Sequence, residues 1–301
     1  MQKYSLGIDI GGSHITCQLY NLKDHLLVND SKVRMSVDGN ASKEEIFDDW
    51  TAAIRESISK IQLSELAGIG FAMPGPFDYE NGIGLFDENV DKFSRLHGVH
   101  VKKEITNRLK LPLSVPIRFV NDAAAFAMGE AGAEAVSGFS RILVLTLGTG
   151  LGSTFIENGK PVAGRYGIPD DGFLYHVPFN SGIADEYFST RWFLGEYQKS
   201  TGKTITGVKQ LAKDYKTDPA VQTLFQRFGA NLGEFLLPWI RNFSAECIIL
   251  GGNISKSRAL FLPSTEEIFR KVETDVTIFP SSLDENAAII GSARLLENEL
   301  S

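Results

Sequence analysis

The chain has 301 residues, 43% of them hydrophobic, and a formal net charge of −7. This length predicts about two domains of ~150 residues, and the acidic balance argues against a nucleic-acid-binding surface. No stretch reaches the ~18 consecutive apolar residues of a membrane span. A first strand near Tyr4 leaves no room for a signal peptide, and two cysteines cannot build a disulfide framework. We therefore expect a soluble, cytoplasmic protein in which Cys17 and Cys247 are buried free thiols.

One sequence pattern occurs twice. Residues 4–21 and 141–158 align without a gap, and each has an apolar run, a turn of glycine and small polar residues, and a second apolar run. Each copy predicts a β-hairpin whose turn lets backbone N–H groups approach a phosphate. Ordinary glycine-rich hairpins would show the same pattern. Two copies, one in each half, favour a nucleotide held between two related domains.

The remaining sequence alternates predicted strands and helices, which indicates two α/β domains. The helix over residues 43–61 begins at a capping box formed by Ser42 and Glu45. The segment 160–185 is irregular and rich in Gly, Pro and Asp, and a loop of this length is usually functional. The other expected elements, in chain order, are strands over 26–35, 66–73 and 117–120, helices over 101–109, 123–131 and 219–242, a strand over 247–250 and a helix over 286–296.

Polar or glycine residues follow the predicted strands, where α/β folds bind ligands. Phosphoryl transfer needs anion-binding turns, a carboxylate for a metal ion and a base. Thr149 and nearby amides could bind phosphates, Asp9 could hold Mg²⁺ directly or through water, and Asp122 could accept a hydroxyl proton. Asp9 could instead cap a turn, and Asp122 could be a helix N-cap. Neither the P-loop pattern nor a GxGxxG with a ribose-binding acid occurs.

Five segments, in order along the chain, resemble motifs of the ROK family (repressor, open reading frame, kinase). The resemblance covers nearly the whole chain and implies the α/β, two-domain, actin-like ATPase fold of ribonuclease H-like and hexokinase-type proteins, with a central cleft. It also implies a first domain over 1–120, joined by the C-terminal helix 286–301, and a second over 121–285. The segments are GIDIGGS at 7–13, GFAMPGPFD at 70–78, NDAAA at 121–125 with GE at 129–130, LGTGLG at 147–152 and LGGNIS at 250–255.

The resemblance further implies an ATP-dependent kinase that transfers the γ-phosphoryl group to a hexose hydroxyl. The acceptor would be the 6-hydroxyl of glucose, fructose or an N-acetylhexosamine, and Asp122 would be the general base. The sugar would be bound by Gly75, Asn89, Asn121, Asp122, His176 and Glu186. ATP and Mg²⁺ would be bound by Asp9, Gly11, Gly12, Ser13, Gly148, Thr149, Gly150, Gly251, Gly252 and Asn253, with Asp9 holding the metal.

The chain departs from the family pattern in its sugar-recognition loop. Phe173 stands where the family has a glutamate and Tyr175 where it has a glycine, so Asp170 or Asp171 could supply the missing carboxylate. The family's zinc-binding cysteine cluster is absent, and no structural zinc is expected. His176 could also be an ordinary loop histidine, and Glu186 a solvated charge at a helix start.

Because these departures concern the sugar-recognition loop, the sequence defines the type of reaction better than the identity of the substrate. A non-catalytic sugar-binding sensor or regulator of the same fold is the alternative function. Family repressors carry an additional N-terminal helix-turn-helix, and this chain is expected to start at its first strand, so direct DNA binding is not expected. The resemblance favours a homodimer, with a small hexose substrate and neither nucleic acid nor membrane as partner.

Overall fold

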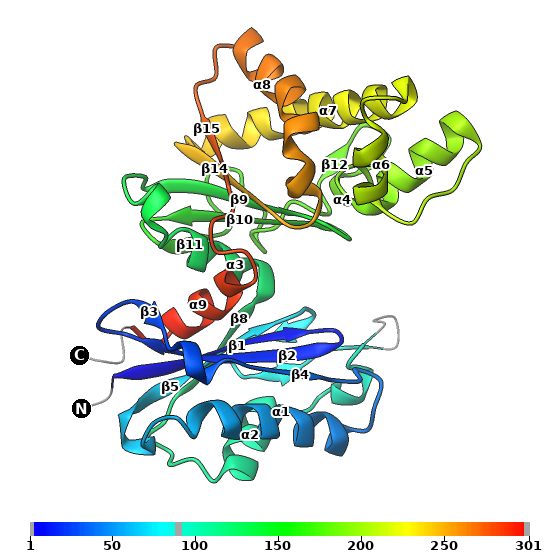
Figure 1. The fold of residues 1–301 in the computed structure, drawn as a ribbon. Helices are drawn as coiled ribbons and strands as arrows, with labels where there is room; N and C mark the ends of the chain where they lie inside the picture. Colours follow the sequence, from blue (N-terminus) through cyan, green and yellow to red (C-terminus); the bar gives the residue numbers. More distant parts are fainter. Residues whose placement is uncertain (1–2, 88–91, 298–301) are drawn as a thin grey trace. The chain divides into compact units, whose positions relative to one another are not determined.

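The computed structural model describes residues 3–87 and 92–297, which divide into two units (Figure 1). The first unit holds the chain up to Gly129 and again from Glu285 onward, and the second holds Glu130–Asp284. The chain therefore crosses from one unit to the other twice. The sequence-based boundary at residues 120/121 lies before helix α3 (Asp122–Glu130), most of which the structure groups with the first unit. No helix among the described residues is long and apolar enough to cross a membrane.

The sheet of the first unit is built around the first repeat. Strands β1 (Tyr4–Gly11) and β2 (His14–Asn21) form the predicted antiparallel hairpin, and β5 (Leu66–Met73) and β8 (Ile117–Asn121) continue the sheet in parallel from β1. The strand order is β3-β2-β1-β5-β8, and β4 also pairs with β2. A small separate hairpin is formed by β6 (Phe77–Asp78) and β7 (Ile83–Gly84).

The strand expected over 26–35 is wrong as a single element. It is divided into β3 (Leu26–Leu27) and β4 (Val33–Ser36) by a 3₁₀ turn over Asn29–Ser31. The buried Ser31 hydroxyl donates to the Val28 carbonyl at 2.6 Å and accepts the Leu19 N–H at 2.9 Å. These bonds satisfy backbone groups that would otherwise need a ladder partner, so the chain can turn here without an energetic penalty for unpaired groups.

The second unit repeats the arrangement. Strands β9 (Arg141–Leu147) and β10 (Leu151–Glu157) form the second predicted hairpin, and β14 (Cys247–Gly251) and β15 (Thr277–Pro280) continue in parallel from β9. With β11 (Lys160–Val162) the strand order is β11-β10-β9-β14-β15. Each sheet thus has an antiparallel hairpin followed by two parallel strands, so the repeat read in the sequence is a repeat of topology.

Helices cover both faces of the first sheet (Figure 1). Helix α1 (Lys43–Ile58) and helix α2 (Val101–Leu109) lie on one face, and α9 (Asn286–Arg294) lies on the other. The Ser42–Glu45 capping box that was predicted forms at the start of α1. The core between α1 and the sheet contains Trp50, which is fully buried together with Phe47 and Ile54.

The C-terminal helix packs so closely on its sheet that side chains have no room. A Cβ atom added to Gly7 of β1 would overlap the Ile289 carbonyl, and one added to Gly70 of β5 would overlap the Ser292 carbonyl. The Ser292 hydroxyl accepts the Ile8 N–H at 3.2 Å. Glycine is therefore required at these strand positions by close backbone approach. The helix predicted over 286–296 forms, and it belongs to the first unit.

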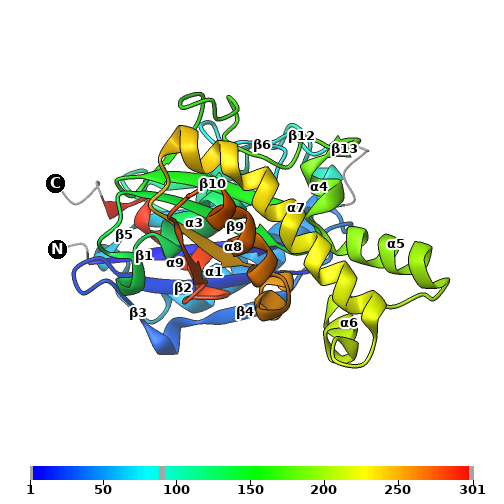
Figure 2. The same cartoon turned by 90° about the horizontal axis from the view of Figure 1, so that it is seen from above.

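Aromatic side chains dominate the core of the second unit. The long helix α7 (Pro219–Phe243), which was predicted, presents Phe225, Phe228 and Phe235 to this core, and α8 (Leu262–Lys271) lies beside it (Figure 2). Several elements of this unit, α8 and β11 among them, were not predicted from the sequence. The others are α4 (Ala184–Tyr187), α5 (Thr190–Thr201), α6 (Val208–Asp214) and the edge strand β15; a 3₁₀ segment also covers Ile254–Leu260, and β12 (Pro178–Phe179) pairs with β13 (Gly182–Ile183).

A buried carboxylate at the end of α3 is hydrogen-bonded to residues of the second unit. Glu130 is 1% exposed, and it accepts hydrogen bonds from the Ser281 hydroxyl at 2.5 Å and from the backbone N–H groups of Ser282 and Leu283 at 3.1 and 3.0 Å. A buried charge is tolerated when its lone pairs are satisfied in this way. These hydrogen bonds connect Glu130, which follows the first crossover, with residues 281–283, which precede the second.

Candidate active site

Asp9 lies on β1 two residues before the end of the first hairpin strand. It pairs with Thr16 of β2 and Ala72 of β5, so neighbouring strands hold it on both sides. The pKa of Asp9 is raised to about 6, chiefly by burial and also by the negative charges of Asp122 and Glu285, while Arg34 opposes this rise. Asp9 and Asp122, 113 residues apart in the sequence by subtraction of their numbers, therefore lie within electrostatic reach of each other in the first unit.

Arg34, which the sequence reasoning did not single out, balances this acidic pair. Its guanidinium donates to a Glu285 carboxylate oxygen at 2.9 Å, at the point where the chain re-enters the first unit. Residues from β1, β4 and the start of α9 thus meet at one edge of the sheet. Only the folded topology brings these groups together, because no local motif connects them.

Helix α3 begins beyond the end of β8, and Asn121 caps it. The Asn121 side-chain oxygen accepts the N–H groups of Ala123 and Ala124 at 2.9 and 3.3 Å. The N-cap role that was an alternative for Asp122 therefore falls to its neighbour. Solvent reaches the Asp122 side chain, while crowding by surrounding protein atoms still raises its pKa. Asp122 accepts the Ala123 N–H at 2.9 Å through one carboxylate oxygen.

Tyr79 joins two of the predicted sugar-site residues and was missed in the sequence. Its hydroxyl accepts a hydrogen bond from the Asn121 amide at 3.1 Å and donates to the Met73 carbonyl at 3.3 Å. A Cβ atom added to Gly75 would lie 3.4 Å from the same hydroxyl. Burial raises the pKa of Tyr79 to about 12, so it stays a neutral donor and acceptor. Asn89 lies outside the described residues.

The first glycine turn consists of Gly12 and Ser13, and Gly11 pairs with His14 across it. The Ser13 hydroxyl lies 3.4 Å from His14 Nδ1. Partial burial and the nearby positive charges of Arg34 and Lys92 lower the pKa of His14, with Glu285 opposing them. The cationic groups of Arg34 and Lys92 thus lie within electrostatic reach of the turn, and Arg34 is paired with Glu285.

The second glycine turn, Gly148-Thr149-Gly150, is held by residues of the following helices. The Gly148 carbonyl accepts hydrogen bonds from the Thr190 N–H and hydroxyl at 2.8 and 2.9 Å. Asp185 accepts the Leu151 N–H at 2.7 Å and forms an ion pair with Arg191. Asp185 was also missed, because the sequence reasoning named only its neighbour Glu186.

Gly251 ends strand β14, and Gly252 and Asn253 follow it in the same unit. Gly252 has a φ of 83°, a left-handed value that favours glycine, and a Cβ there would come within 2.7 Å of the Leu147 nitrogen. The Ser255 hydroxyl donates to the Gly252 carbonyl at 2.7 Å. The structure thus brings Gly252 of this predicted ATP-binding segment against the end of β9, directly before the second glycine turn.

The sugar-recognition loop, which departs from the family pattern, places an acid beside His176. Nδ1 of His176 lies 3.6 Å from a carboxylate oxygen of Asp171, and both side chains are half exposed. The other Asp171 oxygen accepts the Phe173 N–H at 3.0 Å. Of the two acids that could replace the missing glutamate, Asp171 is therefore the one paired with the histidine. The exposed Glu186 accepts the Ile183 N–H at 3.0 Å and so caps its own helix, α4.

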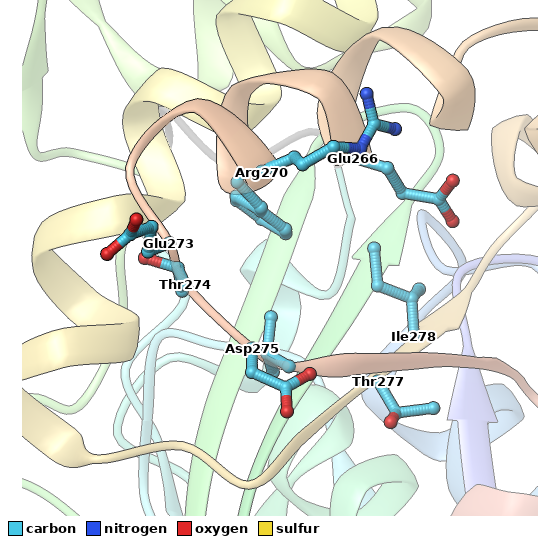
Figure 3. A pocket seen from close by; sticks show the side chains of 9 residues that line it. Glu266, Arg270, Glu273, Thr274, Asp275, Thr277 and Ile278 are labelled. Carbon is cyan, nitrogen blue, oxygen red and sulfur yellow. The ribbon is translucent and has the colours of Figure 1, made fainter.

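A separate hollow of about 570 Å³ lies between α8 and β15. Glu266, Glu273 and Asp275 line it, and their carboxylates point in different directions (Figure 3). It contains none of the residues predicted for sugar or nucleotide. Over residues 3–87 and 92–297, no group of three or more His, Cys, Asp or Glu side chains is arranged to hold a metal ion.

The chain is similar to known proteins over nearly its whole length. The ROK family model matches residues 5–299, and the chain belongs to the ROK family. It is 27% identical to a glucokinase of Thermotoga maritima, over 98% of each chain, and 25% identical to a xylose repressor of Bacillus subtilis, over 97% of this chain and 77% of the repressor.

The fold is that of the family's solved structures, an actin-like ATPase fold. A ROK family glucokinase from Streptomyces griseus, solved in complex with glucose and AMPPNP, superposes with a TM-score of 0.72 at 22% identity and covers 97% of this chain and 98% of its own. The fold class predicted from the sequence is confirmed.

Proposed function

We propose that this protein is an ATP-dependent hexose kinase in which Asp122 is the general base. The observation that carries this proposal is the division of roles at the start of α3. Asn121 satisfies the helix N-terminus, and Asp122, with its raised pKa, lies within electrostatic reach of Asp9. A carboxylate whose pKa is moved toward neutrality is suited to accept a proton. Relatives named as glucokinase and N-acetyl-D-glucosamine kinase support a sugar as the acceptor.

In the proposed reaction, the 6-hydroxyl oxygen of the sugar attacks the γ-phosphorus of ATP. The bond from that phosphorus to the β,γ-bridging oxygen breaks, ADP leaves, and the hydroxyl proton passes to the carboxylate of Asp122. Tyr79 orients the Asn121 amide, because its hydroxyl accepts one of the two amide protons. The other amide proton is then directed by this bond and can donate to a neighbouring sugar hydroxyl.

Asp9 is the residue that would hold magnesium in this site. With a pKa of about 6 it is largely ionised at pH 7, and Mg²⁺ is commonly held by one or two carboxylates together with water and substrate phosphates. This donor set fits an ion shared with ATP, and the ion would neutralise phosphate charge. We also propose that no structural zinc is present, which metal analysis of protein purified without added metal would test.

We assign nucleotide binding to both glycine turns and to Gly251-Gly252-Asn253, and the sugar's other hydroxyls to His176 and Glu186. Asp171 extends this assignment, since its carboxylate lies 3.6 Å from Nδ1 of His176 and can position the ring for a contact with a sugar hydroxyl. We further propose a homodimer, which light scattering coupled to size exclusion would test.

The experiment is a panel of hexoses incubated with ATP and Mg²⁺ while ADP release is followed. The panel contains glucose, fructose, mannose and the N-acetylated hexosamines, and the control omits the sugar. We expect one of these to raise ADP release far above the control. ADP release unchanged by every sugar would contradict the kinase proposal.

A sugar-binding sensor is the second candidate, favoured by the rewritten 160–185 loop and by the similarity to a xylose repressor. Calorimetry on the same panel separates the two functions. A sugar that binds but causes no ADP release would support the sensor, and turnover would exclude it.

A further inference from the structure

Lys92 lies over the turn of the first hairpin. A Cβ atom added to Gly12 would overlap Nζ and Cδ of Lys92 and come within 2.7 Å of its Cε. A Cβ added to Gly39 would lie 3.2 Å from the Lys92 Cβ and 3.4 Å from the Gly12 carbonyl oxygen. Gly12 is not among the glycines with positive φ, and the Lys92 side chain can lie this close to the turn because position 12 carries no side chain.

The backbone next to Lys92 is held in place by a buried aromatic residue. Phe93 has a φ of 64°, an uncommon conformation for a bulky side chain. Its ring is buried, with its centroid 5.7 Å from those of Trp50 and Phe86, and its N–H donates to the Gly39 carbonyl at 2.7 Å. Strained residues persist where the surrounding structure over-determines them. The packing of Phe93 therefore fixes the point from which Lys92 extends over the turn.

The Lys92 ammonium has no counter-ion in the described part of the chain. The ion pairs formed among residues 3–87 and 92–297 do not include it, whereas Arg34 is paired with Glu285 at 2.9 Å. Its charge contributes to lowering the pKa of His14, at the edge of the same turn. An unpaired cation thus lies against a glycine turn of the proposed phosphate site.

We propose that Lys92 binds a phosphate group at the first glycine turn. The group is either the terminal phosphate of ATP or the phosphate of the phosphorylated sugar. This inference rests on the proposed kinase function. A lysine ammonium is a compact point charge with three donors, and it can add a charge-assisted hydrogen bond to those from turn N–H groups. Because Lys92 is 80 residues from Gly12 by subtraction of their numbers, no local motif connects it with the turn.

The test compares Lys92→Met with Lys103→Met, a control at an exposed lysine on α2 of the same unit. With the hexose found active, we expect Lys92→Met to lower kcat/KM for ATP about 10- to 100-fold, the size of a lost charge-assisted hydrogen bond. The KM for hexose should change less than about twofold, and Lys92→Arg should restore most of the loss because it keeps the charge. Lys103→Met should match wild type in both kcat/KM for ATP and KM for hexose.

Calorimetry distinguishes the two phosphate sources and does not depend on turnover. Weaker binding of AMPPNP by Lys92→Met, with ADP binding unchanged, would identify the terminal phosphate. Weaker binding of hexose 6-phosphate would identify the product. Thermal unfolding of each variant checks that the fold is kept.

The outcomes separate this inference from the kinase proposal. An active wild-type enzyme whose Lys92→Met variant equals Lys103→Met in kcat/KM and in binding would overturn the role of Lys92 alone. A wild type inactive with every hexose would overturn the kinase proposal. In that case equal binding of both AMPPNP and hexose 6-phosphate by wild type and Lys92→Met would overturn the Lys92 inference as well, and weaker binding of either by the variant would support it.

Discussion

The two glycine hairpins have the same strand pairing but opposite charges against their turns. At the first turn, Lys92 lies over Gly12 without a counter-ion among the described residues. At the second, a carboxylate oxygen of Asp185 accepts the Leu151 N–H, and Arg191 pairs with that carboxylate. A cation without a counter-ion attracts a phosphate. Beside the second turn, by contrast, the Leu151 N–H already donates to the Asp185 carboxylate. The repeated backbone therefore does not determine the function of each turn; the side chains that the fold brings to it do.

Only the first hairpin carries a member of the acidic pair. Asp9 stands on β1, and the equivalent position of β9 is Thr146, which pairs with Gly152 as Asp9 pairs with Thr16. We infer that the first hairpin carries the chemistry and that the second carries binding and rigidity. Changes at the first hairpin should then mainly affect rate, and changes at the second should mainly affect stability.

The largest effect is expected for Asp122→Asn. Removal of a general base typically costs ~10²- to 10⁴-fold in rate, and Asn keeps the shape of the side chain, so ATP binding should be unchanged. Steady-state kinetics and calorimetry measure both quantities, with Asp30→Asn, an exposed acid of the same unit, as control. A variant that keeps more than about a tenth of wild-type kcat, far above that range, would show that Asp122 is not the base.

A second prediction concerns pH. The pKa values of Asp9 and Asp122 are raised, that of Asp9 to about 6, and both carboxylates must be ionised for the proposed reaction. We expect kcat/KM to be flat above neutral pH and to fall about tenfold per pH unit as the pH drops below about 6 and Asp9 is protonated, with protonation of Asp122 adding to the fall. A profile that stays flat down to about pH 5 would contradict the involvement of these carboxylates.

Asp9 should also destabilise the fold at neutral pH. Its folded pKa of about 6 exceeds the ordinary value of 3.8, so the folded state binds the proton more tightly than the unfolded state. The penalty is therefore complete above about pH 6 and absent below about pH 4. We expect Asp9→Asn to raise the free energy of unfolding by about 1–3 kcal/mol at pH 7 and to leave it unchanged near pH 4. Chemical denaturation at the two pH values tests this prediction, with Asp30→Asn as control. Equal gains in the free energy of unfolding at pH 7 and near pH 4 would refute it.

The smallest effect is expected at the second hairpin. Asp185→Asn keeps an acceptor for the Leu151 N–H but loses the charge that pairs with Arg191, so the free energy of unfolding should fall by about 1 kcal/mol or less. Asp185→Ala leaves that N–H without its acceptor and should cost about 1–3 kcal/mol. Denaturation of both variants beside Asp214→Asn, an exposed acid on α6, measures the difference. Equal losses for the two Asp185 variants would argue against this hydrogen bond.

The sequence predicted what local patterns encode. Both hairpins, strand β5, the start of α1 and the long helix α7 form where alternation, helical spacing or a capping box indicated them. Helices α5 and α6 and the edge strand β15 carry weaker periodicity, and the structure stabilises them by packing against α7 and β14. Local patterns also could not say that Asn121, and not Asp122, caps α3.

The candidate site was only partly predictable for a similar reason. Asp9, Asp122 and the glycine turns stand in recognisable segments, but their partners come from distant parts of the chain. Arg34, Tyr79 and Lys92 reach the site through strand pairing and aromatic packing. At the start of α4 the sequence reasoning named only Glu186, and the structure shows that its neighbour Asp185 contacts the second turn.

The central claim is transfer of a phosphoryl group from ATP to a sugar hydroxyl, and the most direct measurement identifies the acceptor. Phosphorus NMR of the reaction with ATP, Mg²⁺ and the hexose that raises ADP release follows every phosphate in the mixture. We predict a sugar phosphomonoester formed in equal amount to ADP, and almost none of it with Asp122→Asn. ADP accompanied only by inorganic phosphate, with no phosphomonoester from any hexose, would contradict the account.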